Sequence, residues 1–562
     1  MAVDAGTPSR AAPLQPIPLL SRFYGFGSIY GKTIRDSRLA FIIAAGLFGG
    51  LALVMGAAIG SVFPTPAARL EVDKLIGSMP ASMVNLFGNA TLMGPKLATL
   101  GGYMTWKYGA LFGLGAGLWS ILALSGTLAG EASRGSLDLV AAAPFGKRRI
   151  ALEKLAAHLT VLWLAMAFVA IMIVVSSNAF GDPNLGDPIP LGGAIGFATW
   201  AGFIAMCFGG LALALAPLLG RSGSAGVAGL AMVALWVASG LDIGGPLVAV
   251  SPFHWTINHI PLVGYYDGPG LALVGIVAVV LLALGVELFS RRDLGVTAGL
   301  SLPATPAAVL GVRGPVSRAF GDELPRALAW GIGFGVMGAL LASLVGSFAN
   351  QIGSDSSLSK TFALIFPGKD LATAGGWLQL YADLFYIAAG LAAATFVSKW
   401  ASDETDGRLE EILSVPMSRA RWVVAGGVGA ILAVVVMTVV LALGIGLGAA
   451  AGGATAGDAM VGTASLGLYA AAIVGVGVAI GGLWRTSLAA EIAALVVVAT
   501  YLVDLLAPAL KLPDWIHQIA LTAHMGHPMV GVWDRDGVVA CLVIAVGGIL
   551  VGAWGMSRRD VD

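Results

Sequence analysis

The stretch EASRGSLDLVAAAPFGKRR, at residues 131–149, is repeated in the second half of the chain as DETDGRLEEILSVPMSRAR, at residues 403–421. Each copy lies between long apolar runs and ends in a cluster of basic residues. The gapless alignment pairs Glu131 with Asp403, Gly135 with Gly407, Leu137 with Leu409, Asp138 with Glu410 and Pro144 with Pro416. A polar segment repeated at equivalent places in two hydrophobic halves predicts a duplicated membrane protein with two contact points on its cytoplasmic side.

Each copy has the pattern of a short amphipathic helix. In the second copy, Leu409, Ile412 and Leu413 share one helical face, and Pro416 follows at the same spacing. Proline disfavours a helical conformation in the residue before it, so we expect the helices to end near Pro144 and Pro416. A single segment of this kind would also fit an ordinary juxtamembrane helix, but the duplication favours a dedicated function.

The composition excludes a soluble globular protein. Of the 562 residues, 57% are hydrophobic and only 11% are charged, and apolar runs long enough to cross a bilayer, about 20 residues, recur throughout. The net charge is zero, so no nucleic-acid-binding surface is indicated. Cys207 and Cys541 lie inside apolar runs and are expected to be buried rather than to form a disulfide or a metal site. Residues 1–36 lack a signal-peptide pattern, which predicts a cytoplasmic N-terminus.

We therefore expect an all-α membrane protein with twelve transmembrane helices in two six-helix halves. Residues 1–20 predict a disordered cytoplasmic tail, and the first half, residues 21–292, begins with an interfacial helix at about 22–37. A proline-containing linker with a second interfacial segment follows at 293–326, and the second half covers 327–562. The predicted spans are about 38–60, 102–128, 159–178, 191–219, 224–247 and 270–289, then 327–348, 378–400, 423–450, 462–483, 487–507 and 537–556.

The distribution of basic residues predicts the orientation. With both termini in the cytoplasm, all but about eight of the 31 Lys and Arg residues lie on the cytoplasmic side, as the positive-inside rule requires. An even number of spans inserts both halves in the same direction, so they form a parallel repeat about an axis along the membrane normal. Two broken, aromatic-containing segments, at 251–266 and 513–533, are expected to form short external or re-entrant helices.

The sequence offers little evidence for catalysis or metal binding. It lacks the G-x-x-x-x-G-K-[ST] loop that cradles phosphates, so any ATP-driven engine would be a separate polypeptide. No nucleophile and base are arranged for covalent chemistry, and no catalytic residue is predicted. Most of the histidines fall in the two external segments, but they do not supply the four well-spaced ligands of a closed zinc site.

Acidic residues inside the predicted spans are few, which disfavours coupling to an ion gradient. Glu287 is expected to pair with Arg291, four residues along the same helix. Asp242 and Asp504 lie near span ends. Glu491, about one turn inside its span, is the best candidate for a proton relay.

The repeated element resembles the coupling region of ABC-2-type ABC transporter permeases, and the fusion of two six-span halves resembles actinobacterial exporters of polyketide antibiotics, of the tetronasin-resistance type. The resemblance covers nearly the whole chain. It implies a multi-pass protein of the bacterial plasma membrane that works with a separate ABC ATPase, two copies per chain. The coupling helices docked into the ATPase would contain Glu131, Gly135, Leu137, Asp138 and Pro144, and Asp403 (or its neighbour Glu404), Gly407, Leu409, Glu410 and Pro416.

The resemblance also implies a mechanism and a substrate class. ATP and Mg would bind to the partner, so this chain would hold no cofactor. Closure of the ATPase dimer would move the coupling helices and rock the two halves against each other. The substrate would be a hydrophobic small molecule that enters from the inner leaflet. Trp119 and Trp236, on the second and fifth spans, are candidates for the substrate pathway, with lipid-facing packing as the alternative for each.

Two other functions are compatible with the sequence. An ion-coupled secondary transporter would need acids deep in the membrane and would not need twin cytoplasmic helices. An exporter of a lipid-linked polymer, from the same superfamily, would need a wide pathway lined by aromatic and polar groups.

Overall fold

The computed structural model describes residues 28–62, 65–67, 69–70, 88–127, 146–241, 245–291, 314–346, 373–405, 407–506 and 513–559. In this part of the chain, eleven helices are long and apolar enough to cross a membrane, and twelve if a pair bent by 60° within α20 (Ala374–Thr405) is one span. Helices suit this role because they satisfy every backbone hydrogen bond internally. The structure therefore confirms the prediction of an all-α membrane protein.

A first group of helices runs from residue 28 to residue 291. Its helices are α2 (Ile29–Asp36), α3 (Arg38–Val62), α6 (Ala90–Met93), η1 (Gly94–Ala98), α7 (Leu100–Tyr103), η2 (Met104–Tyr108), α8 (Gly109–Ser125), α11 (Lys147–Phe180), η4 (Pro183–Leu185), α12 (Leu191–Leu241), α13 (Pro246–Ala249), α14 (Pro252–Trp255), η5 (Pro261–Val263) and α15 (Gly268–Ser290). α7, η2 and α8 follow one another without a gap and form a single candidate span.

A second group runs from residue 314 to residue 559. Besides α20, it contains α17 (Pro315–Ser343), α21 (Leu409–Leu413), α22 (Arg419–Ala451), α23 (Gly457–Leu483), η6 (Thr486–Leu488), α24 (Ala489–Leu506), α25 (Asp514–His517), η7 (Leu521–His524), β1 (Gly526–His527), η8 (Pro528–Val530), β2 (Val532–Trp533) and α26 (Arg535–Arg558). The two short strands pair antiparallel.

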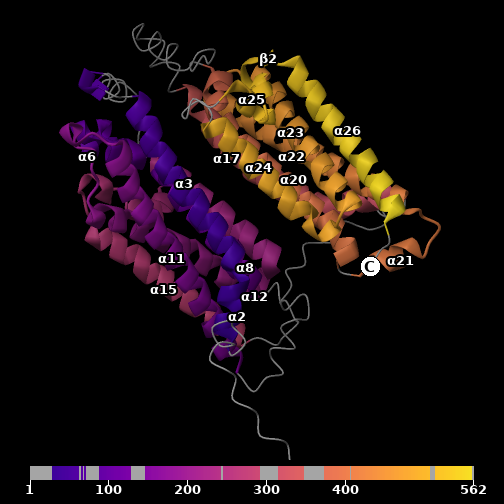
Figure 1. Cartoon of the computed structure of the whole chain (residues 1–562), viewed down its shortest axis with the longest axis horizontal. Coiled ribbons are helices and arrows are strands. Elements are labelled where there is room, and N and C mark those ends of the chain that lie inside the picture. The colour runs from indigo at the N-terminus through magenta and orange to yellow at the C-terminus, as the bar shows by residue number, and fades with distance from the viewer. Residues whose placement is uncertain are drawn as a thin grey trace, which may run out of the picture.

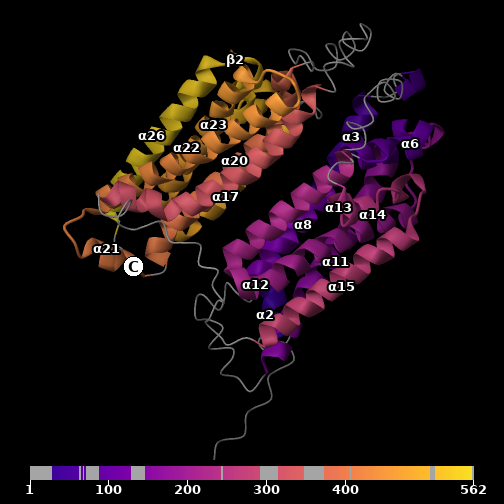
Figure 2. The same ribbon diagram turned by 180° about the vertical axis from the view of Figure 1, so that it is seen from behind.

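The two groups lie side by side with their long helices running in similar directions (Figure 1). α2 and α21 lie at one end of the molecule, which we call the α21 end, and α6 and β2 lie at the other, which we call the β2 end. The view from behind shows the same arrangement (Figure 2). The sequence predicts that the α21 end is cytoplasmic.

The break in α12 separates two candidate spans, Leu191–Arg221 and Gly223–Gly240. At the break, Gly220 has a φ of 70° and a ψ of −177°, a conformation that residues with a side chain avoid. This turn coincides with the predicted boundary between the fourth and fifth spans.

The sequence predicts an interfacial segment at the end of the linker at 293–326, followed by a span. In the structure, α17 covers the end of this segment and the start of the span, and it runs through Pro325 without interruption. Although proline removes one backbone donor, packing against α22 supports the first part of α17. A Cβ atom at Gly429 of α22 would lie 2.7 Å from the Cβ of Ala319, so the two backbones are in close contact there.

The buried apolar side chains form two large clusters, one in each group. The second segment of α12 joins them, because Val237 belongs to the cluster of the second group and Trp236 packs against both. Cys207 and Cys541 are both buried, as their sequence surroundings predict.

Candidate functional site

The end of α20 turns sharply into α21. The backbone N–H of Gly407 donates to the carbonyl of Glu404 at 3.0 Å, and Gly407 has a φ of 72°, which favours glycine. α21 then ends at Leu413, before Pro416, as the position of the proline predicts. Ser418 caps the next helix by accepting a hydrogen bond from the backbone N–H of Arg421 at 3.2 Å.

The apolar face of α21 packs onto the protein itself. Leu409 is only 1% exposed, and Ile412 and Leu413 are partly buried against the core of the second group. The opposite face presents the carboxylates of Glu410 and Glu411 to the exterior. The surface that α21 offers to another molecule is therefore acidic, with an apolar tip formed by the exposed Val415 and Pro416 that follow it.

Asp403 connects the start of this turn to three other segments. Its carboxylate accepts a hydrogen bond from the indole N–H of Trp422 at 3.2 Å, and it lies 3.7 Å from the guanidinium of Arg318 and 3.9 Å from that of Arg408. The Trp422 ring stacks on Trp400 with 5.0 Å between ring centroids. Asp403 thus links α20 to α17, α22 and the residue that precedes α21.

The neighbouring acid, Glu404, contacts a different set of segments from Asp403. It accepts a hydrogen bond from the hydroxyl of Thr486 at 2.6 Å and forms an ion pair with Arg559. Arg559 also donates to the backbone carbonyls of Gly481 and Trp484, at 3.1 and 2.9 Å. Through these contacts the base of α21 is tied to the ends of α23 and α26.

The first copy of the element lies outside the described residues. This applies to Glu131, Gly135, Leu137, Asp138 and Pro144. The basic residues that follow them begin α11, where Arg149 pairs with a glutamate one turn along the helix at 2.8 Å.

Trp119 and Trp236 occupy different environments. Trp119 is partly buried in the first group, where it makes an edge-on contact with His158 at 6.0 Å between ring centroids. Trp236 packs against the apolar cores of both groups. Of the two candidates for the substrate pathway, only Trp236 lies where the groups meet.

Two of the four acids considered for ion coupling have partners in the structure. Glu287 contacts Arg291 at 2.6 Å, which confirms the predicted ion pair, and Asp504 accepts a hydrogen bond from a threonine hydroxyl at 2.7 Å. Glu491 is exposed in the first turn of α24, and Asp242 lies outside the described residues. Among the residues that the structure describes, no three His, Cys, Asp or Glu side chains converge as metal ligands.

At the β2 end, sequence analysis missed a second repeated feature. The motif Pro-x-Val-Gly occurs at 261–264 and at 528–531. In both places a single 3₁₀ turn is closed by antiparallel pairing, between Ile260 and Tyr265 in one group and between β1 and β2 in the other. The glycines have φ values of 89° and 81°. The repeated Pro-x-Val-Gly motif is itself the signal in the sequence by which this pair could have been found.

The backbone of each turn packs closely against the first part of a candidate span. A Cβ at Gly193 of α12 would lie 2.6 Å from the carbonyl oxygen of Pro261. In the second group, a Cβ at Gly462 of α23 would lie 2.5 Å from the carbonyl oxygen of Pro528. The two turns therefore cover equivalent helices of the two groups at the β2 end.

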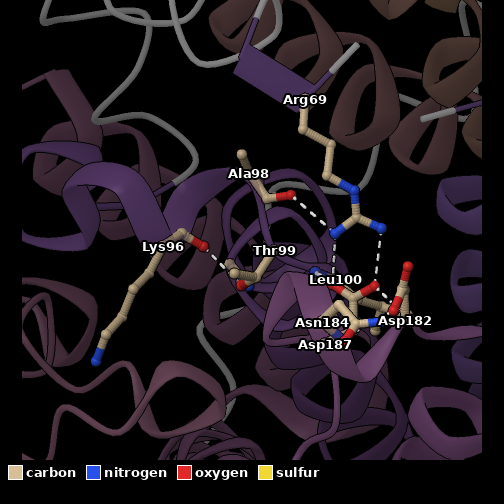
Figure 3. Close-up of polar contacts among 9 residues, drawn as sticks. Arg69, Lys96, Ala98, Thr99, Leu100, Asp182, Asn184 and Asp187 are labelled. Carbon is tan, nitrogen blue, oxygen red and sulfur yellow. Dashed lines mark hydrogen bonds and ion pairs between the residues drawn. The ribbon is translucent and has the colours of Figure 1, made fainter. Parts of the chain in front are cut away.

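A buried ion pair lies at the β2 end of the first group (Figure 3). Arg69 directs its guanidinium at Asp187 with two N–O distances of 2.5 and 2.8 Å, and it also donates to the carbonyl of Ala98 at 3.4 Å. The backbone N–H groups of Leu100 and Asp182 donate to the same carboxylate at 2.8 and 2.9 Å. Asp187 therefore joins three segments that are distant in sequence.

Asp187 lies in the connection between α11 and α12, outside the candidate spans. Burial alone would raise the pKa of its carboxyl, but the hydrogen bonds from Arg69 and from the backbone N–H groups of Asp182 and Leu100 lower it below its ordinary value of 3.8. The carboxylate is therefore ionised at neutral pH.

Comparison with known proteins supports a transport function. Residues 313–556 match the family described as "Multidrug efflux system permease Rv1217c, C-terminal domain". No curated protein matches the chain. The matched region contains α21 and runs almost to the end of α26. The match and the many apolar helices together support a multi-pass membrane efflux permease, a transport subunit rather than an enzyme.

Proposed function

We propose that this chain is the membrane subunit of an ATP-driven exporter of hydrophobic drugs or natural products in the bacterial plasma membrane. A separate ABC ATPase would bind ATP and Mg, with one copy on α21 and a second on the counterpart at 131–144. The observation that carries this proposal is the family match over residues 313–556, because it links a multidrug efflux permease to the region that contains α21.

The contacts of α21 are suited to transmit a force. The buried Leu409 fixes α21 to the core of its group, and the preceding acids, Asp403 and Glu404, connect its base to five other elements through hydrogen bonds and ion pairs. A partner that binds two conformations of the permease with different affinity would shift their equilibrium through these contacts. Movement of the second group against the first would then change access to the region around Trp236.

The acidic outer face of α21 provides the test. Reversing its charge in Glu410→Lys/Glu411→Lys is expected to weaken binding of the proposed ABC ATPase partner by at least about tenfold, equivalent to about 1.4 kcal/mol. Both side chains are exposed, so the fold should be preserved. Binding and permease-stimulated ATP turnover would be measured in reconstituted liposomes.

The matched control is Asp536→Lys, an exposed acid on α26 at the opposite end of the molecule. It should leave ATPase binding unchanged. Unchanged binding in the Glu410→Lys/Glu411→Lys variant would contradict docking at α21. Transport that continues without the ATPase and stops when a protonophore is added would contradict ATP coupling altogether.

One observation favours proton coupling as a second candidate. Glu323 of α17 is only 3% exposed, and its Oε2 atom has no hydrogen-bond partner among the described residues. The nearest cation recorded for it is Arg326, at 3.9 Å. A buried acid in a membrane helix is a common feature of proton pathways, and the protonophore experiment distinguishes the two functions.

A further inference from the structure

The first group contains a cavity of about 260 Å³ at the α21 end. It is bounded by α2, by the residues that end the α8 span, by α11 and by the break in α12. The charged side chains among its described lining residues are Lys32, Asp36, Lys154 and Arg221. Three separate elements thus direct cationic side chains to one cavity.

The positions of these charges are built into the fold. Lys154 is only 3% exposed, and its ammonium group lies 3.5 Å from the carbonyl of Thr127, which faces the same cavity. The guanidinium of Arg221 lies beside Gly126, where a Cβ would meet its Nε atom at an ordinary contact distance of 3.5 Å. Asp36 pairs with its neighbour Arg35 at 3.3 Å, which partly neutralises the one acid.

The cavity lies at the level where the membrane begins. α2 is followed directly by the candidate span that starts at Arg38. Just beyond that residue, Leu39, Ile42 and Ile43 are 64, 62 and 51% exposed, a surface suited to acyl chains. The cationic side chains therefore lie near the height of lipid headgroups.

The second group provides an internal comparison. Its corresponding cavity lies between α17, the end of α20 and the start of α22, and it measures only about 30 Å³. The stacked rings of Trp400 and Trp422 border it, and its described lining carries three acids, Asp322, Glu323 and Asp403, beside two cations. Among the described lining residues, the cavity of the first group is the larger and has more cations than acids, whereas the cavity of the second group has more acids than cations.

We propose that the cavity of the first group binds the phosphate headgroup of an anionic phospholipid from the leaflet in which α2 lies. Arg and Lys donate strong, charge-assisted hydrogen bonds to phosphate oxygens, and basic pockets between membrane helices are suited to anionic headgroups. The volume lies below the range of about 300–1,000 Å³ that drug-sized ligands occupy. It suits a headgroup whose acyl chains extend along α3. This inference is independent of how transport is energised.

The test compares lipids added to the purified full-length protein in a neutral detergent. Phosphatidylglycerol is expected to raise the midpoint of thermal unfolding more than phosphatidylcholine does. The exposed pair Lys32→Gln/Arg221→Gln should remove at least half of that difference, and Lys154→Gln provides a second variant from inside the cavity. Lys399→Gln, in the cavity of the second group, is the matched control and should keep the full response.

Inorganic phosphate distinguishes a lipid from a free anion. Phosphate at millimolar concentration should not reproduce the shift caused by phosphatidylglycerol, because it lacks the acyl chains that pack along α3. Equal shifts with the two phospholipids would overturn the proposal, as would a full response in all the cavity variants. A complete response to inorganic phosphate would replace the lipid by a soluble anion and so contradict the lipid assignment.

Discussion

The carboxylate of Asp187 is fully buried, yet Arg69 and two backbone N–H groups satisfy it. A buried ion pair of this kind is not necessarily more stable than an apolar pair of similar size, because removing both charges from water is costly. Removal of one partner is different, because the other charge is then left buried and uncompensated. The double substitution should therefore cost less stability than the single substitution.

We expect Asp187→Asn to lower the free energy of unfolding by about 3–5 kcal/mol. The double variant Arg69→Met/Asp187→Asn should recover part of that loss, because it leaves no unpaired charge. Thermal unfolding in detergent measures both. A double variant less stable than Asp187→Asn alone would contradict a role for the ion pair in this loss.

The stability that the Asp187 carboxylate contributes should decrease as the pH falls. The folded-state pKa of Asp187 is lowered, so the unfolded chain binds a proton more readily than the folded chain. The stabilisation is fully present above the ordinary value of 3.8 and is lost as the pH falls through the lower folded-state value. Between about pH 5 and pH 3, the wild type should therefore lose more stability than Asp187→Asn does.

The alignment of the two copies of the repeated element could not predict the contacts of individual residues. The repeat identified Asp403 and left Glu404 as an alternative, and the structure gives each acid its own partners. Those partners, Arg318, Trp422 and Arg559 among them, come from distant parts of the chain. Since sequence spacing holds no information on such contacts, the two acids could not be told apart beforehand.

At the scale of helices, glycines bring backbones together. α17 and α22 touch along their length, and a Cβ at Gly444 would collide with the carbonyl of Gly335. Small residues permit this approach in membranes, where helix association depends on close packing. By contrast, nothing lies within 4 Å of the Cβ position at Gly46 of α3.

Gly444→Leu should therefore force α17 and α22 apart and lower the free energy of unfolding by about 1–3 kcal/mol. Gly46→Leu is the control, because leucine favours a helix over glycine by about 1 kcal/mol and meets no obstacle there. Unfolding midpoints in detergent would separate the two effects. Equal stability of the two variants would argue against direct backbone contact at Gly444.

Helix boundaries followed from the sequence where local chemistry decides them. Gly220 divides α12 and Pro416 lies beyond the end of α21, because both effects act on the backbone itself. The unbroken course of α17 through Pro325 did not follow from the sequence, because the contact between Ala319 of α17 and Gly429 of α22 arises only in the folded structure. The turns at 261–264 and 528–531 lie within the two segments that were predicted to form short helices, but their shared motif was missed because only three of its four positions repeat.

At the scale of the whole molecule, each group of helices has its own apolar core. The second segment of α12 carries contacts between them, through Val233, Trp236 and Val237. Groups with separate cores are expected to insert and fold independently. Their association should then be sensitive to the side chains at this junction, which is also where a pathway between moving groups would lie.

We therefore expect a chain cut by a protease site inserted between residues 291 and 314 to keep both pieces folded in the membrane. The pieces should co-purify in mild detergent, and Trp236→Ala should weaken their association about tenfold if the indole contributes about 1.4 kcal/mol to the junction. Trp119→Ala, which removes an indole from within the first group, is the control and should leave co-purification unchanged. Equal losses in the two variants would mean that tryptophan removal destabilises the first group as a whole. A persistent association in Trp236→Ala would mean that other contacts hold the groups together.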